Sequence, residues 1–146
     1  MTALQARLDA EVALRNSISE LSAQKPDPLM IARTTRDECH ALTCALFAYG
    51  NVQSIVAFLG SLQPSWIDAN EEQIRDSTQG KYYRFQNSED IAQRHITLGR
   101  LKAHWGVEET FERGYRNDGV FGGISFLIET IYDLNSLSSQ GLKFLI

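Results

Sequence analysis

The chain has 146 residues, a net charge of -4 at neutral pH and a hydrophobic fraction of 43%. A chain of this length buries about two thirds of its unfolded surface, enough for one domain with a core. This composition excludes intrinsic disorder and fibrous classes, and the acidic balance excludes a uniformly basic nucleic-acid binder. The sequence has neither a run of roughly 20 apolar residues nor the pattern of a signal peptide, so we expect a cytoplasmic protein without membrane contact.

The first predicted element is an amphipathic helix over residues 2–23, whose apolar side chains fall on two offset stripes. Pro26 and Pro28 end it, because proline lacks the backbone donor and restricts the residue before it. Thr35 and Glu38 then match a capping box, which predicts the start of the next helix.

The most apolar stretch, residues 41–51, predicts a buried central helix. Its apolar side chains cover most of the circumference, which indicates neighbours on all sides. Gly50 ends this helix, and Asn51 caps an amphipathic helix over Val52–Leu62 that Pro64 closes.

Two capped helices follow. Asn70 caps a short polar helix over residues 71–77, and Asn87 with Ser88 caps a longer helix through Trp105. Nothing in the sequence alternates convincingly with the period of a strand, and no internal repeat is present. The predicted fold class is therefore all-α, an orthogonal bundle of helices without a sheet, in one domain over residues 1–146.

The last third of the chain predicts a short helix over residues 107–113, a polar turn over residues 114–119 and a long apolar helix over residues 120–137 that Asp118 caps. The predicted inner face of the long helix consists of Phe121, Ile124, Ile128, Ile131 and Tyr132. Residues 141–146 then end the chain on apolar side chains, which predicts contact with further polypeptide.

Cysteine and histidine spacing gives only weak support for a metal. Cys39 and Cys44 lie about 140° apart on a helix, so we expect free thiols rather than a disulfide. His40 and Cys44 are four residues apart, a spacing that metal ligands use, but two ligands do not complete a site. The preferred interpretation is a buried, hydrogen-bonded His40, and no metal or cofactor is predicted.

The sequence gives equally weak support for a catalytic site. Glu108, Glu109 and Glu112 stand at a helix start, where the helix dipole favours acidic residues without any catalytic role. Gly119, Gly122 and Gly123 lack the Lys-Ser/Thr sequence of a phosphate loop, so close helix packing is the simpler explanation. No catalytic residue is predicted.

Positive charge is concentrated in residues 81–105, which carry five Lys or Arg and two Asp or Glu. Residues 81–86 interleave cations with aromatic rings, the two ingredients of sequence-tolerant nucleic-acid binding. The alternative is a satellite core in which cations cover aromatic rings. Arg94 falls inside the apolar stripe of its helix, so its guanidinium must reach solvent, pair, or face a ligand.

Three segments resemble an uncharacterised family of bacterial conserved hypothetical proteins: residues 45–51 (Ala-Leu-Phe-Ala-Tyr-Gly-Asn), 82–86 (Tyr-Tyr-Arg-Phe-Gln) and 123–127 (Gly-Ile-Ser-Phe-Leu). The match runs from about Pro26 to the last residue. Members of that family are considerably longer, and their further part carries an Arg- and Trp-rich segment and a Leu-Asp-Thr-His-like motif. The resemblance implies that this chain is the N-terminal portion of a longer protein.

The order of elements is more remotely similar to the first half of the helix-hairpin-helix base-excision DNA glycosylases. In those enzymes the residues after the apolar helix help to wedge or contact the damaged strand, and they match Tyr49, Gly50 and Asn51. The chain departs from that family because its paired Gln-Thr signal, its Gly-rich hairpin and its catalytic Lys or Asp have no counterpart here. Base flipping would therefore need residues beyond these.

The resulting interpretation is a DNA-associated protein that has no catalytic residue in this chain. The residues expected to bind nucleic acid are Tyr49, Asn51, Lys81, Tyr82, Tyr83, Arg84, Arg94 and Arg100. Two alternatives stay open. One is a non-catalytic module that docks another protein chain, or a second copy, through the aromatic patch and the apolar C-terminal segment. The other is a small-molecule enzyme that uses the glutamates near Val107.

Overall fold

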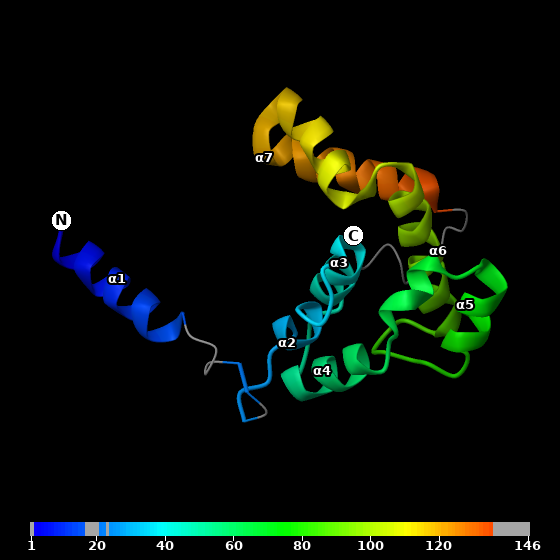
Figure 1. Cartoon of the computed structure of the whole chain (residues 1–146), viewed down its shortest axis with the longest axis horizontal. Helices are drawn as coiled ribbons and strands as arrows, with labels where there is room; N and C mark the ends of the chain where they lie inside the picture. Colours follow the sequence, from blue (N-terminus) through cyan, green and yellow to red (C-terminus); the bar gives the residue numbers. More distant parts are fainter. Residues whose placement is uncertain (1, 17–20, 23, 136–146) are drawn as a thin grey trace.

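The computed structural model describes residues 2–16, 21–22 and 24–135. Within these ranges the chain forms seven α-helices and one 3-10 helix, and its only β pairings are two isolated bridges, which confirms the all-α fold class. The elements, drawn in Figure 1, are α1 (Ala3–Arg15), α2 (Leu29–Ala32), α3 (Glu38–Leu46), α4 (Val52–Gly60), η2 (Pro64–Asp68), α5 (Glu71–Thr78), α6 (Ser88–His104) and α7 (Gly106–Leu134).

The most deeply buried helix is α6, in which every residue of the stretch 90–98 is buried. It packs against η2 and α5, against α3 and against α7. Its start is the predicted one, because the Asn87 side chain accepts the amide hydrogen of Glu89 at 2.9 Å and Asp90 accepts that of Asn87 at 3.0 Å. The bundle is thus organised around α6.

The prediction that residues 41–51 form a buried helix with neighbours on all sides is wrong, because Ala41, Ala45 and Ala48 are exposed. The predicted ends of this helix also need correction. Asp37 caps it, with its carboxylate 2.9 Å from the His40 amide nitrogen, and the helix stops at Leu46, before Gly50. The reason is tertiary: the residues after Leu46 leave the helix to join an aromatic cluster formed with a later turn.

The helix starts that asparagine predicts are confirmed at α4 and α5. Asn51 accepts the amide hydrogen of Gln53 at 3.0 Å, and Asn70 accepts that of Gln73 at 2.9 Å. The short helix α2, which begins directly after Pro28, was not predicted.

The first helix ends at Arg15, earlier than the predicted residue 23, and residues 17–20 and 23 lie outside the described part. None of its residues is buried, and Figure 1 shows it standing apart from the other helices. Its exposed apolar side chains are Leu4, Leu8, Val12 and Leu14. Isolated helices of about this length are marginal in water, so α1 has little support within the described structure.

The helix α7 consists of two limbs that fold back on each other, as the yellow and orange segments of Figure 1 show. The break lies at Asp118 and Gly119, whose backbone angles are not helical. The break therefore falls at the end of the predicted turn over residues 114–119, and the first limb stays helical through the earlier part of that range. A Cβ atom on Gly114 would lie 2.2 Å from the Gly122 carbonyl oxygen, so the two backbones touch. The close packing predicted for Gly122 is confirmed. The same prediction is wrong for Gly119, where a Cβ atom would meet nothing within 4 Å.

This close packing decides which face of the second limb is covered. Gly122 and Gly123 turn toward the first limb, because only glycine lets the backbones approach so closely. The predicted inner face is therefore mostly wrong: Ile131 is buried, but Phe121 is 81% exposed, and Ile124 and Tyr132 are also exposed. An apolar stripe consequently faces outward on α7.

The contact between the two limbs of α7 gives a first prediction. Gly114→Ala should lower the free energy of unfolding by about 1–3 kcal/mol, because the new methyl group meets backbone that cannot move without separating the limbs. Gly60→Ala is the control: its Cβ would meet only Ile31 at 3.9 Å, and alanine favours the helix, so stability should stay or rise slightly. Urea denaturation of both variants measures the difference, and equal effects would contradict the close packing.

Candidate nucleic-acid interface

The aromatic stretch of residues 81–86 forms a tight turn between α5 and α6. Tyr83 and Gln86 exchange two backbone hydrogen bonds, both 2.9 Å long. Between them Arg84 has a φ of 55°, a left-handed conformation that non-glycine residues rarely adopt. The turn presents Tyr82 and Phe85 to solvent, with 67% and 68% of their surfaces exposed, and Arg84 is exposed between them.

Tyr83 points the opposite way and anchors the turn in the core. Its ring stacks on Phe58 with centroids 4.4 Å apart and meets Phe47 edge to face at 5.8 Å. Its hydroxyl group donates a hydrogen bond of 2.9 Å to the Tyr49 carbonyl oxygen. The satellite-core alternative therefore describes Tyr83, whereas its two neighbours project outward.

Tyr49 joins the turn from the end of the α3 segment. Its hydroxyl group donates to the Gln86 side-chain oxygen. Burial raises the pKa of Tyr49, so the phenol stays protonated at neutral pH. The Arg84 guanidinium lies 5.5 Å from the Tyr49 ring and 5.9 Å from the Phe85 ring, within the range of cation–π attraction. Gly50, with a φ of 111°, leaves room for that guanidinium.

Lys81 is held at the base of the turn. Its Nζ atom donates to the Ser61 carbonyl oxygen at 3.0 Å and lies 5.4 Å from the Trp66 ring centroid. Asn51 is exposed beside Gly50, where its side-chain oxygen caps α4. The structure thus gathers Tyr49, Asn51, Lys81, Tyr82, Tyr83 and Arg84 in one region. Phe85 was not among the predicted site residues, although its place in the same turn was a usable signal.

Two predicted site residues are not on this surface. Arg94 lies beneath it and is 1% exposed. Arg100 lies farther along α6, where it donates to Glu71 and, at 2.9 Å, to the Leu134 carbonyl oxygen. The position of Arg94 in the apolar stripe of its helix already distinguished it from Arg84 in the sequence, whereas the pairing of Arg100 had no such signal because charge alone does not report pairing.

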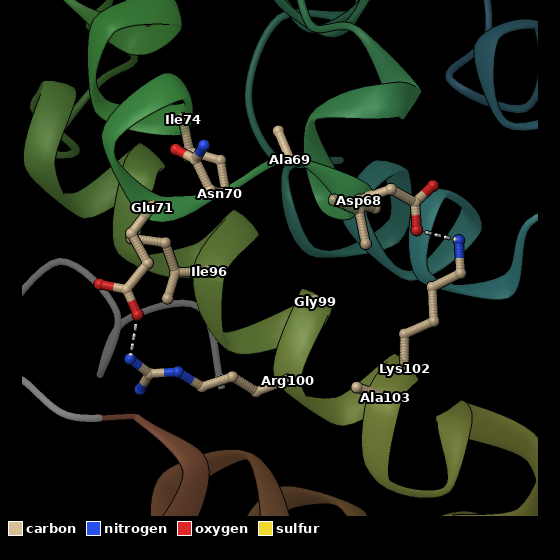
Figure 2. Close-up of a pocket in the computed structure, with 11 residues that line it drawn as sticks. Asp68, Ala69, Asn70, Glu71, Ile74, Ile96, Gly99, Arg100, Lys102 and Ala103 are labelled. Carbon is tan, nitrogen blue, oxygen red and sulfur yellow. Dashed lines mark hydrogen bonds and ion pairs between the residues drawn. The ribbon is translucent and has the colours of Figure 1, made fainter.

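The groove beside Arg100 has a volume of about 500 Å³ and lies between η2, α5 and α6. Figure 2 shows an ion pair at each end: Glu71 with Arg100, and Asp68 with Lys102. Lys102 also pairs with Asp37 at 2.8 Å. Because carboxylates compensate both cations, this groove does not offer the unpaired positive charge that a phosphate backbone requires.

The glutamates near Val107, which were one alternative for a catalytic site, make structural contacts. Glu38 accepts the amide hydrogens of Val107 and Glu108 at 2.7 and 2.8 Å, and thereby caps α7. Glu109 and Glu112 each pair with the arginine four residues later in the same helix. These contacts give Glu38, Glu109 and Glu112 structural roles.

The predictions for the cysteines and His40 hold. His40 is buried, and its Nε2 atom lies 3.1 Å from the Ile31 carbonyl oxygen. Cys39 and Cys44 are free and buried, and burial raises the pKa of the Cys39 thiol to about 12. In the described ranges no group of three or more His, Cys, Asp or Glu side chains is placed to hold a metal ion.

The fold and this surface define an all-α protein with an exposed aromatic turn. Among the described helices, none combines the length and the apolarity that crossing a membrane requires. The family described as "Protein of unknown function (DUF2400)" matches residues 27–146, and the chain belongs to this family. The helix α1 precedes the matched residues. No curated protein and no solved structure matches the chain.

The unusual backbone of Arg84 gives a second prediction. Arg84→Gly should leave the free energy of unfolding within about 1 kcal/mol of the native value, because relief of the left-handed strain, about 1–2 kcal/mol, offsets the lost cation–π contacts. Thermal unfolding measures this. A loss above about 2 kcal/mol would mean that the arginine holds the fold together.

Proposed function

We propose that this chain binds nucleic acid through the turn of residues 81–86. The observation that carries the proposal is an exposed arginine, held in a left-handed conformation between two exposed aromatic rings. A glycine would adopt that conformation without strain, so the side chain of Arg84 is kept at a cost of about 1 kcal/mol or more. Strained residues of this kind cluster at binding sites, which supports a functional role for the turn.

The chemistry of the turn matches the two parts of a nucleotide. Tyr82 and Phe85 offer faces on which bases stack, an interaction worth about 1–3 kcal/mol per base. Arg84 offers a planar guanidinium for a backbone phosphate. Tyr83 keeps the turn rigid, so little conformational freedom is lost on binding.

The remote resemblance to base-excision glycosylases makes duplex DNA with a disturbed base pair the preferred ligand within this proposal. Tyr49, Gly50 and Asn51, which that resemblance places near the damaged strand, adjoin the aromatic turn. The proposal includes no reaction.

Charge reversal at the tip of the turn tests this proposal. Arg84→Glu should weaken the binding of a labelled abasic duplex about tenfold or more and reduce the slope of log affinity against log salt by about 1. Arg116→Glu on α7 changes the net charge equally and should leave the affinity nearly unchanged, since Arg116 pairs with Glu112. Fluorescence anisotropy at several salt concentrations measures both variants. If the Arg84 variant binds with the same affinity and the same salt dependence as the wild type, the turn has no part in DNA binding.

A second candidate is a non-catalytic protein-interaction module, which the outward apolar face of α7 favours. The exposed members of this face are Val120, Phe121, Ile124 and Tyr132. Contiguous apolar surfaces of this kind mark protein contacts. The apolar C-terminal segment predicted to dock another chain lies in residues 136–146, outside the described part.

Self-association through α7 has a direct test. If two copies meet on this face, light scattering should give a dimer whose mass does not depend on salt, and Phe121→Asp should convert it to a monomer because a carboxylate cannot be buried there unpaired. Tyr82→Asp is the matched control on the aromatic turn and should leave the dimer intact. Dissociation by the control alone would place the contact at the turn instead.

A further inference from the structure

The guanidinium of Arg94 is buried without a hydrogen-bonding partner among the described residues. The side chain is 1% exposed, and its Nε, Nη1 and Nη2 atoms all lack an acceptor. Asp90, one helical turn earlier, accepts the amide hydrogen of Asn87. What Arg94 does contact is the face of Phe47, with the guanidinium carbon 4.3 Å from the ring centroid.

A buried charge without a counter-ion is expensive. Removing an ion from water costs more free energy, even after relaxation, than a cation–π contact contributes. Burial lowers the pKa of Arg94 to about 9, which leaves the group charged at neutral pH. An arginine in this position therefore calls for an anion that the described residues do not supply.

Arg94 lies on the inner side of the same aromatic cluster that Arg84 covers from outside. Phe47, on which Arg94 rests, meets Tyr83 edge to face, and Tyr83 meets Tyr49 in the same way at 5.6 Å. The Arg84 guanidinium then lies over the outer part of Tyr49. Two guanidinium groups thus flank one aromatic cluster, one exposed and one buried.

We propose that Arg94 is the inner charge of a phosphate-binding site and that Arg84 is its outer charge. The phosphate group enters beside Tyr49, which is half-buried, whereas Phe47 is fully buried. Guanidinium groups bind phosphate bidentately, and a phosphate would satisfy the orphaned donors of Arg94. The choice of phosphate rests on the proposed nucleic-acid function, whereas the need for an anion rests on Arg94 alone.

The test compares the thermal stability of the wild-type chain and Arg94→Met with two probes. One probe is inorganic phosphate and the other is tetrathymidylate without terminal phosphates, each against sodium chloride at matched ionic strength. Without a probe, Arg94→Met should be as stable as the wild type or more stable, because methionine fills similar space without an uncompensated charge. A probe at about ten times its dissociation constant should raise the wild-type midpoint by about 4 °C and leave the methionine variant unchanged.

Two further variants complete the design. Arg100→Met removes a cation that is already paired with Glu71, so it should keep the full response to the probes. If Arg94→Met does not fold, Arg94→Lys takes its place: it keeps the charge but not the bidentate geometry, and half-saturation should need about tenfold more probe.

The two probes identify the source of the phosphate. A response to inorganic phosphate that is lost with Arg94 supports a site for a free or terminal phosphate, and a response to tetrathymidylate alone supports a backbone phosphate. Equal shifts in the wild type and Arg94→Met, or shifts that sodium chloride reproduces, would overturn the inference. DNA anisotropy separates the two claims, because binding that depends on Arg84 can persist when the Arg94 response is absent.

Discussion

The packing of Phe47 is the contact on which both the fold and the candidate site depend. Its ring is fully buried and meets Phe58 at 4.9 Å, Tyr83 at 5.8 Å and the Arg94 guanidinium at 4.3 Å. These neighbours come from α4, from the aromatic turn and from α6, so one side chain joins three separate parts of the chain. Loss of a buried aromatic ring commonly costs about 3–5 kcal/mol, and here it would also release the turn that carries Arg84.

The glycines of α7 allow its two limbs to pack closely, and the same packing leaves apolar side chains facing outward. Close approach of the two limbs needs Gly114 and Gly122, and it turns the small-residue face of the second limb inward. The larger apolar side chains of that limb, Phe121 foremost, must then face outward. Hydrophobic periodicity cannot foresee this, because it assumes that the bulkiest stripe is the covered one. The apolar face of the second limb therefore points outward because the two limbs of α7 pack against each other through their glycines.

Local signals in the sequence predicted much of the fold because the physics behind them is local. The asparagine caps at residues 51, 70 and 87 are confirmed, since a side chain that satisfies free amide hydrogens acts within one helical turn. Long-range outcomes were missed. The burial of Arg94, the pairing of Arg100 and the greater burial of α6 than of α3 depend on which helices meet, and charge or apolar content does not encode that.

Two departures from ordinary folding rules lie in one place. The helix caps, the ion pairs of Lys102 and the buried His40 satisfy their polar groups. Arg84 in a left-handed turn and Arg94, buried without an acceptor in the described part of the chain, do not follow those rules, and both flank the cluster of Tyr49 and Tyr83. Natural sequences agree with local rules except where function demands otherwise, because each violation costs stability. Two independent costs on either side of one aromatic cluster therefore support the proposal that this region, rather than the compensated groove near Arg100, is the binding site.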